Sequence, residues 1–335
     1  MMDRRQVLAS GALGALATAL PLRAFASEAA AGARSFVLTT RVELASAPAG
    51  ANLTVPLLGT YGAQLAGDKR LADGLAAAAL PDGSAYTMAS APVAALPATL
   101  LVQETVTVAD RAGGDGATIT AEERALYTLP RGTAADGALV AQHAAQITQA
   151  GGSDRQRARA IYDWVVANTF RDNAVAACGM GDAALMLREG RMGGKCADIN
   201  SLMVCLARAS GIPAREQFGL RLAPSRVAAA MGATSPDVSG GQHCRAEVWL
   251  EDAGWTPVDP ADVRKVMLGE NLTLDTTRAQ EIADKLFGWS EGNWAMYNTG
   301  RDLALGGPFD FLMYPTLSAE GGSVTWNLQS QEVTA

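Results

Sequence analysis

Histidine is nearly absent from this sequence, which has only His143 and His243 among 335 residues. Imidazole is the side chain that most readily exchanges protons near neutral pH, so chemistry that depends on it has two places to occur. His143 shares one helical face with Leu139, Val140 and Ile147, which indicates a packed or half-buried residue. His243 is therefore the histidine whose surroundings matter most for function.

Basic residues are outnumbered in this chain. Lys and Arg number 27 against 34 Asp and Glu, which gives a net charge of −7 and a pI near 5.0. A nucleic-acid-binding protein needs a basic patch or stripe, so we expect no nucleic-acid partner. After the N-terminal region no apolar run is long enough to cross a bilayer, so we expect no stable membrane insertion once that region is removed.

The N-terminal region has the three parts of an export signal. Residues 1–5 are charged and include the pair Arg4-Arg5, residues 7–20 are apolar, and residues 24–26 fit a small-x-small cleavage site. We predict a twin-arginine-type signal peptide over residues 1–26 and a periplasmic or secreted protein. The alternatives are an uncleaved anchor and a buried helix, although the apolar stretch is short for a bilayer.

Cysteine is scarce as well, with Cys178, Cys196, Cys205 and Cys244. Export would place these thiols where disulfides persist, and Cys178 with Cys244 is one possible pair. Cys205 lies in an apolar helix and is expected to be an inert core thiol. A zinc site formed by His243, Cys244 and two other cysteines has no C-x-x-C or H-x-x-x-H spacing to support it. We expect no metal and no cofactor.

The chain divides by composition into a β-rich part and a mixed part. Period-two alternation over residues 38–44 and 100–108 predicts half-buried strands, and we expect a small β-rich domain over 35–112. A glycine-rich start predicts a linker over 113–134, followed by a catalytic domain over 135–318 and a tail over 319–335. Within that domain, the capping-box residues 153–156 predict a helix over 155–169. Scattered aromatic residues over 289–314 predict packed core, or a cover for a cleft.

The clearest helix begins at Cys196. Apolar residues recur at helical spacing, and Gly211 and Pro213 end the pattern. The apolar positions are Ile199, Leu202, Met203, Leu206 and Ala209. Residues 247–250 and 255–259 then predict two strands joined by a turn. A helix followed by a hairpin favours an α+β fold over a βαβ repeat.

Three residues in this region could form a catalytic triad. Cys196 at a helix N-terminus would ionise more easily, because unpaired backbone N–H groups and the helix dipole favour a thiolate. His243, just before a strand, could act as general acid and base, and Asp259 could fix its tautomer and orientation. Taken singly, each has another interpretation, namely a disulfide cysteine, a surface histidine and a turn aspartate. Their joint order and placement favour catalysis.

The same region resembles the transglutaminase-like superfamily. Residues 194–198 (G-K-C-A-D) and 206–215 (L-A-R-A-S-G-I-P-A-R) resemble its cysteine motif and the helix that follows. Residues 242–250 (Q-H-C-R-A-E-V-W-L) and 254–260 (G-W-T-P-V-D-P) are similar to its histidine and aspartate segments. The similarity covers about residues 150–265. It implies a papain-like core, with a helix bearing Cys196 packed on an antiparallel sheet bearing His243 and Asp259.

The resemblance implies a cysteine enzyme that acts by acyl transfer at carboxamide or peptide bonds of a protein or peptide substrate. Hydrolysis is slightly favoured over cross-linking, because no amine-binding feature is visible. Cys244 and Arg245 replace the usual Ala-Trp after the histidine, which puts the substrate preference in question. The alternative is a non-catalytic periplasmic module that keeps the fold and binds a peptide in the cleft.

Overall fold

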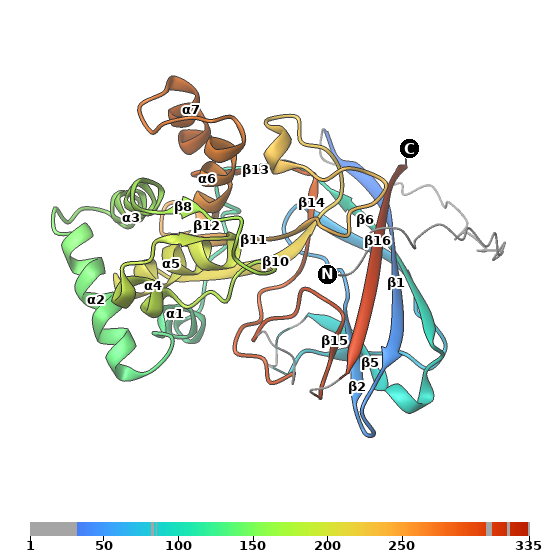
Figure 1. Cartoon of the computed structure of the whole chain (residues 1–335). Coiled ribbons are helices and arrows are strands. Elements are labelled where there is room, and N and C mark those ends of the chain that lie inside the picture. Colours follow the sequence, from blue (N-terminus) through green and yellow to red (C-terminus); the bar gives the residue numbers. More distant parts are fainter. Residues whose placement is uncertain (1–31, 82–83, 85, 306–309, 320–321, 334–335) are drawn as a thin grey trace, which may run out of the picture.

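The computed structural model describes residues 32–81, 84, 86–305, 310–319 and 322–333, and it has the predicted α+β architecture (Figure 1). The predicted signal peptide, residues 1–26, lies outside the described residues. No helix within the described ranges is both long and apolar enough to span a membrane.

Helices gather around one antiparallel sheet to form the helical lobe (Figure 1). Its strand order is β12 (Gly254–Val258), β11 (Gln242–Leu250), β10 (Ala214–Arg221), β14 (Trp294–Asn298). The helices are α1 (Ala121–Thr128), α2 (Ala134–Ile147), α3 (Asp154–Asn168), α4 (Ala183–Glu189), α5 (Cys196–Ala209), α6 (Pro260–Gly269) and α7 (Thr277–Lys285), with a short 3-10 turn at Ala229–Met231. Helix α5 packs against β11 and β10, so its N-terminus lies beside the central strands.

The second lobe consists mainly of two four-stranded antiparallel sheets. One has the order β16 (Ser323–Val333), β1 (Arg34–Ser46), β6 (Thr99–Val108), β3 (Gln64–Arg70). The other has the order β15 (Thr316–Leu317), β2 (Asn52–Pro56), β5 (Thr87–Pro92), β4 (Ala76–Ala79), and a 3-10 turn covers Val93–Ala95. Two short pairs complete the strands: β7 (Arg111–Ala112) with β13 (Trp289–Ser290), and β8 (Phe170–Arg171) with β9 (Gly193–Gly194).

The alternation predicted for β1 is confirmed, since Leu38 and Val42 are buried while Arg41 and Glu43 are exposed. The capping box predicted for α3 is also confirmed, with Ser153 as the N-cap residue. Such patterns are local and therefore readable from sequence.

Two segments differ from their expected character. The stretch expected to be a linker contains α1, and the stretch expected to be a tail forms β16, which pairs with β1 along nearly its whole length. Figure 1 shows the red β16 beside the blue β1. Pairing between the two ends of a chain leaves no local signal, so composition could not predict it. The domain limits themselves stay a prediction.

The two lobes share one hydrophobic core. Phe36, Leu38 and Val106 from the β-rich lobe belong to the same buried cluster as residues of α3, α5 and β11. The side-chain amide of Gln64 on β3 also bonds to both backbone groups of Met296 on β14, at 2.8 and 2.7 Å. This arrangement holds the sheet of the helical lobe at a fixed position against the β-rich lobe.

Candidate active site

Cys196 is the first residue of α5, as predicted, and is buried with 3% exposure. The start of this helix is organised by Asp198, whose carboxylate accepts hydrogen bonds from the backbone N–H groups of Lys195 at 3.0 Å and of Met180 and Gly181 at 2.9 Å. One carboxylate therefore caps α5 and ties the loop at residues 178–181 to it.

Glycine is required around this carboxylate. Gly179 has a φ of +90°, and a Cβ there would lie 1.9 Å from an oxygen of Asp198. A Cβ on Gly194 would lie 2.6 Å from the Cβ of Asp198. The motif G-K-C-A-D is thus explained by close packing of Gly194 on Asp198, which is needed to place Cys196.

His243 and Asp259 meet as predicted. His243 is near the start of β11, Asp259 follows β12 directly, and the hairpin brings them together. Their Nε2 and Oδ2 atoms are 2.8 Å apart, and both side chains are buried. Since Nε2 is paired with the carboxylate, Nδ1 is the ring nitrogen left for another partner. Asp259 also caps α6 by accepting a hydrogen bond from the Asp262 N–H at 3.0 Å.

A second carboxylate lies beside the histidine. An oxygen of Asp262 is 3.5 Å from Nε2 of His243, while another oxygen of Asp262 pairs with Arg221 at 2.5 Å. Burial and the positive charge of Arg221 oppose protonation of His243, but Asp262 and Asp259 outweigh them and raise the pKa of the imidazole above its ordinary value. The site therefore favours an imidazolium.

The thiol of Cys196 is the complementary partner. Hydrogen bonds from the thiols of Cys178 and Cys244 lower its pKa, burial raises it, and a hydrogen bond and the charge of His243 lower it further. The net result is a pKa well below the usual thiol value. His243 thus contacts Asp259 directly and helps to lower the pKa of the Cys196 thiol, an arrangement suited to a thiolate–imidazolium pair.

Four residues that contribute to the site were not identified from the sequence. Asn200 lies one helical turn after Cys196 and donates to Asp259 Oδ1 at 3.1 Å and to the Cys244 carbonyl at 2.8 Å. Its polarity on the buried face of an apolar helix was a detectable signal. Asp262 was detectable as the third residue after a helix N-cap. The positions of Cys178 and Trp294 depend on tertiary structure and left no such signal.

Trp294 places an aromatic ring next to the histidine segment. Its indole N–H donates to the His243 carbonyl at 3.0 Å, and the guanidinium of Arg245 lies 4.6 Å from the centre of its ring. An aromatic ring therefore does lie next to the histidine segment, but it comes from β14. Arg245 is buried and 3.8 Å from Asp259, so its charge acts inside the site. Trp294 is both packed core, as expected for this aromatic stretch, and part of the site.

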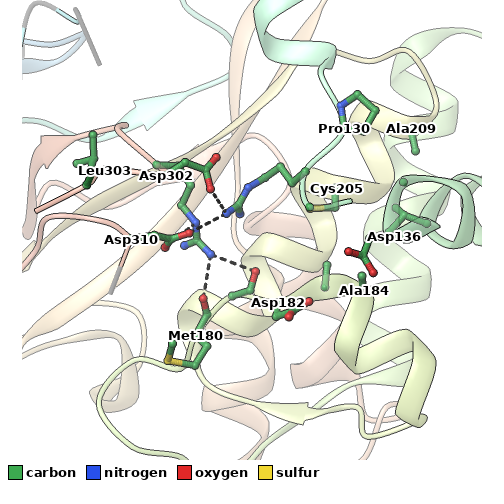
Figure 2. A pocket seen from close by; sticks show the side chains of 18 residues that line it. Pro130, Asp136, Met180, Asp182, Ala184, Cys205, Ala209, Asp302, Leu303 and Asp310 are labelled. Atoms are coloured by element: carbon green, nitrogen blue, oxygen red, sulfur yellow. Dashed lines mark hydrogen bonds and ion pairs between the residues drawn. The ribbon is translucent and has the colours of Figure 1, made fainter. Parts of the chain in front are cut away.

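A cavity of about 560 Å³ lies apart from the triad (Figure 2). Met180, Asp182 and Cys205 line it together with Asp302 and Asp310. Figure 2 shows ion pairs and hydrogen bonds crossing it, and none of the three triad residues lines it. The cavity touches the loop that Asp198 holds, and residues of α2 and α4 also line it.

Comparison with known proteins agrees with this geometry. Residues 141–260 match the Transglutaminase-like superfamily. An "Uncharacterized protein" of Haemophilus influenzae is 46% identical over 159 residues, which cover 45% of this chain and 43% of that protein, so the match spans less than half of the relative's length.

Two solved structures show similarity at lower identity. "Putative Cysteine Protease" from Cytophaga hutchinsonii aligns over 91% of this chain and 92% of that chain with a TM-score of 0.57 and 14% identity, which concerns the fold alone. The periplasmic domain of TgpA from Pseudomonas aeruginosa aligns over 73% of this chain and 92% of that chain, with a TM-score of 0.36 and 15% identity. Residues 141–260 of this chain are a transglutaminase-like domain with a papain-like α+β fold.

Proposed function

We propose that this protein is an exported cysteine enzyme that transfers acyl groups from carboxamide or peptide bonds through a thioester at Cys196, with water as the favoured acceptor. The observation that carries the proposal is the paired geometry of His243. Its Nε2 is held by Asp259 at 2.8 Å, and His243 helps to lower the pKa of the Cys196 thiol at the start of α5. This is the arrangement that activates a thiol nucleophile.

The proposed reaction has two steps, acylation of Cys196 and hydrolysis of the thioester. The Cys196 thiolate attacks the carbonyl carbon and forms the S–C bond, and collapse of the tetrahedral intermediate breaks the C–N bond while His243 gives its proton to the departing nitrogen. Neutral His243 then takes a proton from water, the hydroxyl adds to the thioester, and the C–S bond breaks to restore the thiolate. Asp259 keeps the imidazole in the orientation that both transfers need.

Oxyanion stabilisation requires N–H donors near Cys196. The Ala197 N–H is already bonded to the Cys178 carbonyl at 2.9 Å, so it is not available. The amide nitrogen of Gln242, next to His243, is buried and has no hydrogen-bond partner among the described residues. This side chain is a candidate donor to a developing negative charge on a bound substrate.

Electrophile labelling of the purified mature protein tests the nucleophile. We expect iodoacetamide to modify Cys196 first, because it carries the thiolate, and Cys196→Ala to abolish both rapid labelling and release of ammonia or amine from peptide substrates. Mass spectrometry of the labelled peptides identifies the modified residue. Cys205→Ala is the control and should label and turn over like the wild type, since Cys205 lies in α5 away from the triad.

The outcomes separate the candidate functions. Labelling that persists in Cys196→Ala and maps to Cys178 or Cys244 would contradict the assignment of the nucleophile. Rapid labelling without turnover of any peptide would favour the peptide-binding module instead. An added primary amine that is incorporated into product would assign cross-linking rather than hydrolysis. The N-terminal mass of protein purified from the periplasm tests cleavage after residue 26 and the proposed export.

A further inference from the structure

Three of the four cysteines converge on one point. Cys178 comes from the loop before α4, Cys196 from the start of α5 and Cys244 from β11, and their sulfur atoms all lie within 4.8 Å of one another. All three are free and buried, with exposures of 5, 3 and 0%. Catalysis by a Cys–His–Asp triad needs one thiol, and two further thiols are more than lowering the pKa of that thiol requires.

The spacing of the sulfur atoms fits a metal ion better than a disulfide. Sulfur atoms bound to one tetrahedral cation at about 2.3 Å lie about 3.8 Å from one another. The three sulfur atoms here lie within 4.8 Å of one another, so small shifts would bring them to that spacing. A disulfide would require two sulfur atoms to approach to about 2.0 Å, and no described cysteine is bonded in that way.

The chemistry of the donors selects the class of ion. The trio offers sulfur only, and the Tyr314 hydroxyl donates to Cys178 Sγ at 2.9 Å. Thiolates favour soft or borderline cations with a filled d shell, whereas magnesium and calcium require oxygen ligands. We infer that Cys178, Cys196 and Cys244 form a three-sulfur site for a thiophilic cation of the Zn(II), Cd(II) or Cu(I) type.

Binding at this site and acyl transfer exclude each other, a consequence that rests on the proposed function. The cation forms bonds to the three sulfur atoms, and the protons carried by the Cys178 and Cys244 thiols leave to water. The Cys196 lone pair is then committed to the metal and cannot attack a carbonyl. The protein would be held inactive by such a cation and released by a chelator.

Cadmium titration of the reduced, metal-free full chain tests the site. We expect one equivalent of Cd(II) to bind with the ultraviolet absorption of sulfur-to-cadmium charge transfer, and X-ray absorption of the complex to count three sulfur ligands. Cys178→Ser should weaken binding at least about tenfold, a loss that even outer partners of metal ligands can cause. Cys205→Ser is the matched control, because it removes the remaining cysteine and should leave the titration unchanged.

The X-ray absorption measurement needs no variant, so it decides the question even if a substituted core fails to fold. Two sulfur ligands or fewer, or a titration that Cys205→Ser weakens as much as Cys178→Ser, would overturn the three-sulfur site. Electrophile labelling in the presence of a chelator tests Cys196 as the nucleophile without any metal. A failure of the metal site and a failure of the catalytic assignment are therefore separate results. Adding Cd(II) should block that labelling and EDTA should restore it.

Discussion

Two buried glutamates show how much the partners of a carboxyl group decide its charge. Burial raises the pKa of Glu104 to about 7, because Lys69 at 3.8 Å and the Leu58 N–H at 2.7 Å compensate only partly. Glu216 is equally enclosed, yet Arg131 at 3.0 Å and neighbouring arginines outweigh burial and lower its pKa to about 2. Burial alone therefore does not predict the protonation state.

Glu104→Gln should stabilise the protein at high pH. The folded-state pKa of Glu104 lies above the ordinary value of 4.5, so its ionisation penalises the folded state increasingly between pH 4.5 and about 7 and fully above that range. We expect a gain in the free energy of unfolding of at most about 3 kcal/mol at pH 8. The gain should vanish near pH 4. Urea unfolding at both pH values measures it, and an equal effect at both would contradict the ionisation argument.

At the scale of elements, the first turn of α5 depends on the loop at residues 178–181. Asp198 carries the smaller of the two acidic side chains, yet it accepts hydrogen bonds from three backbone N–H groups and fills the space that two glycines leave. The sequence predicted the helix, its start and its apolar face, because those follow from local periodicity. The loop at residues 178–181 could not be predicted, since it is fixed by contacts to a residue almost twenty positions away.

Asp198→Ala should separate folding from reactivity. Loss of the carboxylate leaves buried N–H groups unpaired, which we expect to cost about 1–3 kcal/mol in unfolding free energy and to slow labelling of Cys196. Ser153→Ala is the control, because it removes the cap of α3 outside the site. It should cost about 1 kcal/mol and leave the labelling rate unchanged. Equal labelling rates in both variants would show that the loop does not position Cys196.

At the scale of the whole molecule, β16 supports both lobes. It pairs with β1, and its backbone also bonds to the segment that leads into β11: Val238 N–H donates to the Leu328 carbonyl at 2.8 Å and Ser330 N–H to the Pro236 carbonyl at 2.8 Å. The segment that leads into β11, the strand that carries His243, is thus held in place by β16. The motifs predicted the candidate triad, but the pairing of β16 with β1 joins residues nearly 300 positions apart and could not be predicted.

Removing residues 323–335 should therefore affect the active site as well as the fold. We expect the truncated chain to unfold at least about 10 °C lower, because the edge of β1 loses a full strand and Leu328 leaves the core. Labelling of Cys196 and turnover should fall together. Thermal unfolding by circular dichroism and size-exclusion chromatography measure the effect.

Glu332→Gln is the control for the truncation. It removes only the partly exposed ion pair with Arg34 and should change stability by less than about 1 kcal/mol. A truncated chain as stable and reactive as this control would contradict the supporting role of β16.

The pairing of β1 with β16 also sets the order of events during synthesis. While the ribosome is still translating, β1 has emerged but half of its hydrogen-bonding partners do not yet exist, so its outer edge is open to aberrant pairing. Closure must wait until translation has passed residue 333, and contacts of such long sequence separation form slowly. The β-rich lobe can therefore close only after β16 has emerged, and nascent chains that stall before that point should depend most on chaperones.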